Sequence, residues 1–281
     1  MKSVLLSNDE IKNELKVMLS SLDMFLTSNK ISYSIDSGTL LGAMRHQGFI
    51  PWDDDIDICI YREDYNRLIN LLKNDNHIED NLYGSSHELG NEEIPYLKIK
   101  NKIIIAEEAV EPGSTEKKST NLWIDVFPID KSPDGIRGKL YFGILDKIVK
   151  KIWFIKKYST HNWKDKEKGI KKTVNRSISA CLNIFTLPFL TEMFIKYCCL
   201  YNEKNVDYAG NIAWGTKKSR HVPKKYFGKI VDIPFEDISV KGWERANDWL
   251  TYVYGDYMTP PPVEKRGSHE LVAWKEDYTL R

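Results

Sequence analysis

The stretch GFIPWDDDIDICIYREDY, residues 48–65, places four aspartates directly before an apolar strand. Asp53, Asp55 and Asp57 stand two positions apart, so the alternation of a β-strand would put them on one face, with Asp54 pointing away. The opposite face would then carry side chains that can be buried, those of Ile56, Ile58 and Ile60. Carboxylates within about 4–6 Å of one another repel. A hard divalent ion such as Mg²⁺ would relieve this repulsion, because it favours a few carboxylates together with phosphate oxygens.

Three interpretations of the acids compete: a solvated acidic turn, a Ca²⁺-binding loop and a catalytic metal site. The Ca²⁺ loop is excluded because Ile58 occupies the sixth position, where an EF-hand needs glycine, and an apolar strand follows. The catalytic site is favoured by the stretch SGTLLGA, residues 37–43, which we expect to form a glycine-rich turn. Asp125, in LWIDVF, is a second indication, because a mid-strand carboxylate is costly to bury without a partner.

A glycine-bearing turn, an Asp-x-Asp strand and an acid on a third strand form the active-site pattern of the nucleotidyltransferase (polymerase β-like) fold. In that pattern the backbone N–H groups of the turn approach phosphates. The carboxylates hold one or two Mg²⁺ ions, with Mn²⁺ as an alternative, which activate the attacking oxygen and stabilise the leaving phosphate.

The elements predicted before residue 130 mix helices and strands. They are a helix over 7–29 with Ser7 and Glu10 at capping-box spacing, a strand over 31–35, a strand over 56–61, a helix over 62–74, two strands within 93–108 joined by a turn at Asn101-Lys102, and a strand over 121–130 ending at Pro128. This order predicts an α/β (α+β) fold with a mixed sheet, a helical insertion and a C-terminal extension.

Charged residues are distributed unevenly along the chain. The net charge is only +1, which gives no indication of a nucleic-acid partner, yet residues 137–176 carry thirteen Lys and Arg against three acids. We therefore expect a catalytic core over 1–135, a basic helical region over 136–205, and a C-terminal segment over 206–281 that completes the substrate pocket. The basic helices of residues 139–176 resemble an interfacial membrane contact, although a solvated amphipathic helix or a groove for an anionic glycan remains open.

The compartment is predicted to be the cytoplasm, with peripheral contact at the inner face of the membrane. The N-terminus turns polar after six residues, too early for a signal peptide. The most apolar window, residues 178–200, contains Glu192 and Lys196, and each charge at mid-bilayer costs about 2.5–3.5 kcal/mol. The four cysteines form no CxxC pair, which is typical of reduced thiols.

Three blocks resemble the LicD/fukutin family of phosphotransferases: DSGTLLGAMRHQGFIPWDDDIDICIYREDY (36–65), NLWIDVFPID (121–130) and YGDYMTPPPVEKRGSH (254–269). The resemblance implies a nucleotidyltransferase fold and Mg²⁺-dependent transfer of a phospho-alcohol from a CDP-activated donor to a glycan hydroxyl, with release of CMP. Bacterial members of the family are associated with phosphocholine on teichoic acids or lipopolysaccharide, and fukutin-type members use CDP-ribitol. Asp55 and Asp57 fall on the family's metal-binding pair, Asp53 on the preceding acid and Asp125 on the acid of the second block.

The predicted site follows from these observations. The catalytic residues are Asp53, Asp55, Asp57 and Asp125, of which Asp55, Asp57 and Asp125 bind the metal, and Asp125 is also the expected general base. Trp52 is the expected aromatic partner of a choline cation. Contacts to the donor or acceptor are predicted for Gly38, Thr39, Gly42, Arg45, His46, Lys98, Arg266 and His269.

Several points stay open. Either Gly38 or Gly42 is the glycine expected to contact phosphate, and structural roles compete for Arg45, His46 and Lys98. A nucleotidyltransferase that releases pyrophosphate, a glycosyltransferase that holds a sugar nucleotide through D-x-D, and a non-catalytic glycan-binding protein are the rival functions.

Overall fold

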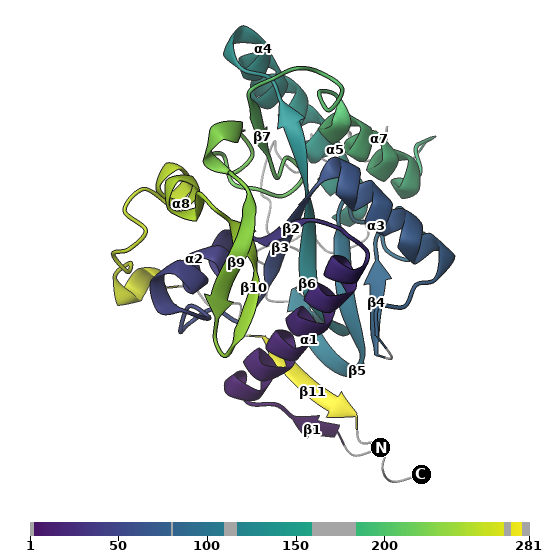
Figure 1. The fold of residues 1–281 in the computed structure, drawn as a ribbon. Coiled ribbons are helices and arrows are strands. Elements are labelled where there is room, and N and C mark those ends of the chain that lie inside the picture. Colours follow the sequence, from purple (N-terminus) through teal and green to yellow (C-terminus); the bar gives the residue numbers. More distant parts are fainter. Residues whose placement is uncertain (1–2, 80, 110–116, 159–183, 267–270, 277–281) are drawn as a thin grey trace.

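The computed structural model describes residues 3–79, 81–109, 117–158, 184–266 and 271–276 (Figure 1). These residues form a nine-stranded sheet whose main path runs β1-β11-β5-β6-β3-β2, with β4 beside β5 and with β7 joining β6 to β8. A separate two-stranded sheet consists of β9 and β10. The strands are β1 (Ser3–Leu5), β2 (Tyr33–Ile35), β3 (Asp57–Tyr61), β4 (Leu82–Ser85), β5 (Leu97–Ala109), β6 (Lys117–Ser132), β7 (Tyr208–Gly210), β8 (Val222–Pro223), β9 (Ile230–Phe235), β10 (Ile238–Trp243) and β11 (Val272–Glu276).

Helices cover the sheet and extend beyond its upper end in Figure 1, where α4, α5 and α7 lie, while α1 and α3 cross in front of the strands. The α-helices are α1 (Asn8–Ser28), α2 (Ser37–His46), α3 (Arg62–Asn74), α4 (Gly135–Leu140), α5 (Asp146–Tyr158), α7 (Leu187–Cys199) and α8 (Ala246–Tyr254), and a π-helical turn (Tyr141–Leu145) joins α4 to α5. Short 3-10 turns lie at Lys224–Tyr226 and Val263–Lys265.

The first helix forms as its sequence predicts. Ser7 Oγ accepts a hydrogen bond from the Glu10 N–H, and the Glu10 carboxylate accepts one from the Ser7 N–H, so the capping box is complete. The apolar stripe of α1 is fully buried at Leu15, Leu19 and Leu22. Packing of this stripe against the sheet and β10 stabilises the helix beyond its intrinsic propensity.

The sheet is mixed, because β3 pairs with β6 in parallel and the other paired strands run antiparallel. The predicted α+β class is therefore confirmed. One hydrophobic core joins residues of the first 135 positions to residues 209–257, and a second core joins α5 and α7 around Trp153 and Phe194.

The expected pair of strands within 93–108 is wrong, because β5 is one long strand. The chain does not reverse at Asn101-Lys102. Instead, the register of β5 against β6 shifts between Lys100 and Ile105. A β-bulge of this kind accommodates the extra residues while both halves of the strand keep the same neighbour.

The strand expected to end at Pro128 continues to Ser132. The Asp125 N–H donates to the carbonyl oxygen of Ile56, the residue before β3, so the alternation of the backbone directs the nitrogen of Pro128 to the side of β6 opposite β3. On that side the pairing with β5 ends at Val126. The nitrogen of Pro128 therefore lies beyond the end of the β5 pairing, where no ladder hydrogen bond is needed.

Among the residues that the structure describes, no helix combines the length and the apolar character needed to cross a membrane.

Candidate active site

Acidic and basic side chains form a row across three strands of the sheet. Asp57 of β3 stands opposite Asp125 of β6, and Asp125 stands opposite Lys98 of β5. Side chains directly opposite one another on paired strands lie on the same face of the sheet. The structure therefore brings together the predicted metal ligands Asp57 and Asp125 and the predicted contact residue Lys98, which lie far apart in the sequence.

Asp36 extends this row and was missed by the sequence interpretation. Its N–H donates to the Asp57 carbonyl oxygen at 2.9 Å, just beyond the last residue of β2. The side chain is only 1% exposed, and burial raises the pKa of its carboxyl to about 6. The signal in the sequence was an isolated acid at the end of the apolar strand ISYSI, the same signal that identified Asp125 at mid-strand.

The predicted glycine-rich turn is wrong, because residues 37–46 form helix α2. Its first turn packs against the acids: the Thr39 hydroxyl accepts a hydrogen bond from the Asp57 N–H at 2.9 Å. A Cβ added at Gly38 would lie 2.6 Å from Asp53 Oδ2. Gly38 and Thr39 therefore hold the aspartate segment at the start of α2.

Gly42 has a different environment. A Cβ added there would lie 2.4 Å from the Gly48 carbonyl oxygen and 3.0 Å from the Ile50 backbone nitrogen. Gly42 therefore lets α2 approach the loop that leads into the acids. Of the two glycines left open above, Gly42 faces protein backbone and Gly38 faces the carboxylates.

These environments predict different effects for two alanine variants. Gly42→Ala should lower the free energy of unfolding by about 1–3 kcal/mol, because the clash is with backbone and the loop has to move. Gly38→Ala should leave stability nearly unchanged but lower transfer activity, because the Asp53 carboxylate can turn away from the new methyl group. Urea unfolding and activity assays on both variants test this, and equal destabilisation of the two proteins would contradict it.

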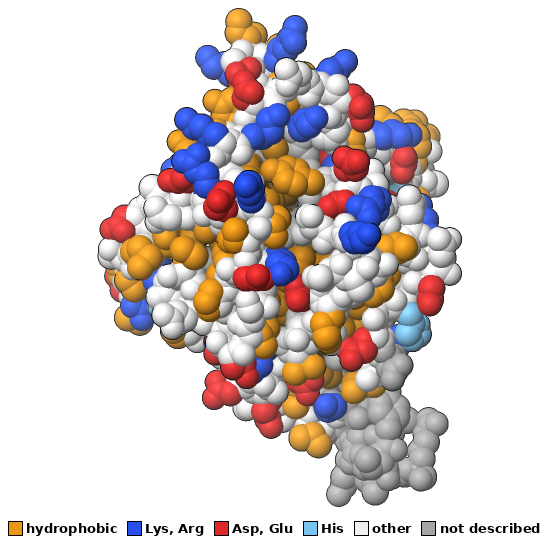
Figure 2. Space-filling model, in the orientation of Figure 1, with side chains coloured by type: hydrophobic (Ala, Val, Ile, Leu, Met, Phe, Trp, Pro, Cys, Tyr) orange, Lys and Arg blue, Asp and Glu red, His pale blue; other side chains and the backbone are white. Residues whose placement is uncertain are grey.

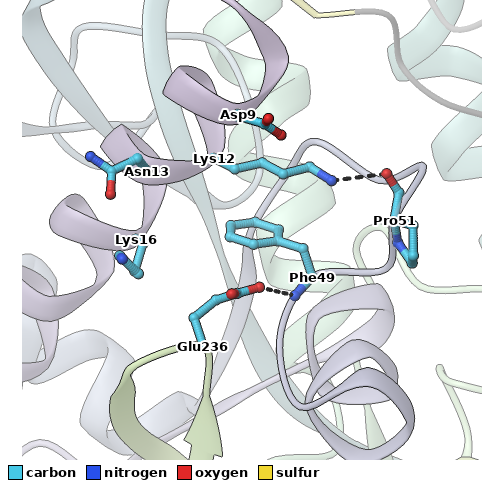
Figure 3. A pocket seen from close by; sticks show the side chains of 7 residues that line it. All are labelled: Asp9, Lys12, Asn13, Lys16, Phe49, Pro51 and Glu236. Atoms are coloured by element: carbon cyan, nitrogen blue, oxygen red, sulfur yellow. Dashed lines mark hydrogen bonds between the residues drawn. The ribbon is translucent and has the colours of Figure 1, made fainter.

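The loop before the acids is held by two elements that are distant in sequence (Figure 3). Lys12 of α1 donates to the carbonyl oxygens of Ile50 and Pro51, at 3.3 and 3.0 Å. The Glu236 carboxylate, from the turn between β9 and β10, accepts the Phe49 N–H at 2.9 Å. A cavity of ≈ 460 Å³ lies between these groups. The loop is thus fixed on the side that faces α1.

The four neighbouring aspartates do not form one regular strand. Strand β3 begins only at Asp57, so Asp53 and Asp55 precede it in irregular backbone. Ile56, Ile58 and Ile60 are buried, as the alternation predicts. Asp54 is also buried and accepts the Leu271 N–H at 2.8 Å, which ties the aspartate segment to the C-terminal strand β11.

The acids interact electrostatically. The pKa of the Asp57 carboxyl is raised well above its usual value, first by burial and then by the charges of Asp55, Asp125, Asp36 and Asp53. Asp54 is absent from this set. All three predicted metal ligands therefore belong to one interacting group, together with Asp53 and the newly identified Asp36.

The donor set fits a hard divalent cation. Carboxylate oxygens are the ligands that Mg²⁺ prefers, and a cation among these groups would relieve the repulsion that raises the Asp57 pKa. Within the described ranges, no three His, Cys, Asp or Glu side chains converge as closely as the ligands of one ion. The fit therefore rests on charge and chemistry, and Mg²⁺ binding stays a prediction.

Lys98 and Trp123 flank the outer end of the row. The Lys98 ammonium lies over the Trp123 ring, 4.2 Å from its centre, and the side chain is 2% exposed. Trp123 Nε1 donates to Asp125 Oδ2 at 3.2 Å. Lys100, two residues further along the same strand, forms an ion pair with Glu92 at 2.6 Å. Lys98 is thus the lysine of this strand that lies beside the carboxylates.

A second group, formed by Arg45, His46, Trp52 and Arg266, lies at the C-terminal end of α2. The guanidinium groups of Arg266 and Arg45 lie over the Trp52 ring, 4.4 and 5.9 Å from its centre. The His46 ring meets Trp52 edge-on at 6.2 Å, and Arg45 Nη1 donates to the Tyr257 carbonyl oxygen at 2.7 Å. The structure therefore brings together four predicted contact residues, while His269 lies outside the described residues.

Tyr254 of α8 also borders the acids, although it was not among the predicted site residues. The pKa of its phenol is raised, first by desolvation of the hydroxyl and then by the charges of Asp36 and Asp57. A phenol with a raised pKa stays protonated at neutral pH and can donate a hydrogen bond. Its position depends on the packing of α8 against α2, for which the local sequence gives no signal.

Comparison with known proteins covers nearly the whole chain. A family model described as "LicD/FKTN/FKRP, nucleotidyltransferase domain" matches residues 30–141. The "Lipopolysaccharide cholinephosphotransferase LicD" of Haemophilus influenzae is 28% identical over 275 residues, which are 96% of this chain and 98% of that protein. The human "Ribitol 5-phosphate transferase FKRP" is 53% identical over 34 residues, only 12% of this chain and 7% of that protein. The carboxylate row lies within the region that the family model matches.

Proposed function

Because this chain belongs to the LicD/fukutin family of phosphotransferases, we propose that it transfers phosphocholine, or a related phospho-alcohol, from a CDP-activated donor to a hydroxyl of a cell-surface glycan precursor. The precursor would belong to a teichoic acid, a lipopolysaccharide or a capsule. The observation that carries the proposal is the match to a cholinephosphotransferase along almost the full length of both chains. The partial match to a ribitol 5-phosphate transferase supports the broader class of phospho-alcohol donors.

Asp55, Asp57 and Asp125 would hold Mg²⁺, and Asp53 would take part if a second ion binds. The ion would supply positive charge at the transferred phosphate. Asp125 would accept the proton of the acceptor hydroxyl, as the new bond from that oxygen to phosphorus forms and the bond to the CMP oxygen breaks. Trp123 supports this role, because its N–H binds one carboxylate oxygen and orients the group.

Positive and N–H groups around the row would receive the donor phosphates. The ammonium of Lys98 lies on the side of Asp125 opposite Asp57. At the other side, the N–H groups of the first turn of α2, which contains Gly38 and Thr39, are suited to a phosphate oxygen. The phosphate would thus bind between β5 and α2, across the carboxylates.

Trp52 suits the anionic part of the donor better than a choline cation. A quaternary ammonium needs open aromatic faces, but two guanidinium groups already approach the Trp52 ring. Arg45 and Arg266 would also repel a second cation. We therefore propose that the two arginines, oriented by Trp52, bind an anionic group of the donor or acceptor.

One assay tests the proposal. The purified protein is incubated with Mg²⁺ and CDP-choline, CDP-ribitol or CDP-glycerol, with and without glycan acceptors, and the released nucleotide is identified. CMP release that depends on the acceptor supports phospho-alcohol transfer. Pyrophosphate release from a nucleoside triphosphate would indicate a nucleotidyltransferase, and a nucleoside diphosphate released from a sugar nucleotide would indicate a glycosyltransferase. No CMP from any CDP ester with authentic acceptors present would refute the proposal.

A further inference from the structure

The helical segment from Gly135 to Lys151 presents an apolar stripe to solvent. Ile136, Leu140, Ile144 and Ile148 stand four residues apart, and each is between 51% and 77% exposed. Residues four apart lie on the same side of a helix. The π-helical turn in the middle of the segment winds less tightly than an α-helix, which keeps this spacing nearly in line. Solvent-exposed apolar side chains of this size, aligned over four turns, indicate a contact surface.

The charged side chains exposed on the same segment are all basic. They are Arg137, Lys139, Lys147 and Lys151. None of them forms an ion pair with another described residue. Asp134, before the segment, is the nearest exposed acid on its N-terminal side. In Figure 2, hydrophobic side chains stand among Lys and Arg at the top of the molecule, together with a few acidic side chains.

The only acid of the segment is turned inwards. Asp146 is 4% exposed and binds Arg220, Lys150 and the Tyr197 hydroxyl. Tyr141 on the inner side of the segment, and Trp153 just after the segment, are buried in the second core. These contacts fix the rotation of the helix about its axis. The apolar and basic side chains therefore stay outward as one surface.

We propose that this surface, Gly135–Lys151, docks the protein on an anionic lipid bilayer. A helix lying in the membrane interface needs apolar side chains to enter the acyl boundary and basic side chains to meet the headgroups, and this surface supplies both. A second copy of this chain would instead bring its own four cations against these four. The absence of any exposed acid within the segment favours the lipid surface over a second copy, because two such faces would repel each other.

The sequence alone indicated lipid contact over residues 139–176, of which 159–176 lie outside the described residues. Among the described residues, the exposed apolar and basic side chains lie nearer the N-terminus than this prediction, on α4, the π-helical turn and the first turns of α5. The inference needs no assumption about the reaction, because lipid binding is measured without turnover.

The test is co-sedimentation with vesicles of phosphatidylcholine alone or mixed with phosphatidylglycerol. The protein should bind the mixed vesicles and be released by salt. Lys147→Gln with Lys151→Gln should lower the partition coefficient about 30-fold, since each basic residue near an anionic surface contributes about 1 kcal/mol. Lys73→Gln with Lys229→Gln, which removes two exposed lysines elsewhere, should leave binding unchanged.

A second pair of variants tests the apolar stripe. Ile144→Ser with Ile148→Ser should weaken binding at least about tenfold, and Val17→Ser with Met24→Ser, two exposed apolar residues of α1, should not. Unchanged melting temperatures would show that all four variants are folded. Wild-type protein that stays in solution with mixed vesicles at low salt overturns the inference. The inference is also overturned if sedimentation velocity shows a dimer of the wild type and a monomer of Ile144→Asp. A second copy of the chain would then cover the surface.

Discussion

Asp57→Asn is expected to lower phospho-alcohol transfer about a thousandfold or more while making the metal-free protein more stable. Asp57 lies at the centre of the carboxylate group, and a divalent ion contributes several kcal/mol to the reaction. Its raised pKa means that the folded state disfavours the ionised carboxylate. The variant removes that charge, so in EDTA at neutral pH it should melt at a higher temperature than the wild type.

The sign of the pH dependence follows from the same shift. A carboxyl whose pKa is raised on folding stabilises the fold below its unfolded pKa of about 3.9, and this contribution is lost as the pH rises through the folded pKa. The stability advantage of Asp57→Asn in EDTA should therefore be larger at pH 8 than at pH 5. Mg²⁺ should raise the melting temperature of the wild type and have little effect on the variant.

Asp54→Asn is the matched control. Asp54 lies in the same run of acids but binds the Leu271 N–H and is not among the main charges that raise the Asp57 pKa. The control is expected to lose some stability and to keep both its activity and its response to Mg²⁺. If Asp57→Asn retained activity and lost stability, the carboxylates would have only a structural role.

Asp130→Asn is expected to lower the free energy of unfolding by about 3–5 kcal/mol. Asp130 is fully buried, and its carboxylate accepts two hydrogen bonds from the Arg62 guanidinium at 2.8 Å and one from Asn202 at 2.7 Å. Asp130 thus connects β6 to Arg62, the first residue of α3, and to Asn202, which follows α7. Removing one partner of a buried pair leaves the other charge uncompensated, which is the source of the large cost.

A double-mutant cycle separates this effect from general disruption of the core. Arg62→Met combined with Asp130→Asn should cost clearly less than the sum of the single changes, because no buried charge then remains unpaired. Asp64→Asn, which breaks the partly exposed Arg67–Asp64 pair, should cost less than about 1 kcal/mol. Additive costs in the urea unfolding of the cycle would show that the ion pair is not coupled.

Local patterns in the sequence predicted the elements that depend on local contacts. The capping box and apolar stripe of α1 are such a case, because both involve residues three or four positions apart. The predictions failed where a neighbouring segment decides the outcome. The bulge in β5 keeps both halves of the strand on β6, and Pro128 is tolerated because the pairing of β6 with β5 has ended at Val126.

The sequence alone identified Asp53, Asp55, Asp57 and Asp125 as the acidic residues to consider and the mixed α+β class, because these depend on residue type and on alternation along the chain. The family was indicated by the resemblance of three sequence blocks. Only the tertiary structure placed Asp36 and Lys98 in one row with Asp57 and Asp125, and Tyr254 beside them. Alternation determines which face a side chain occupies, but the register between strands determines its neighbours. That register depends on the packing of the whole sheet, which no single stretch of sequence contains.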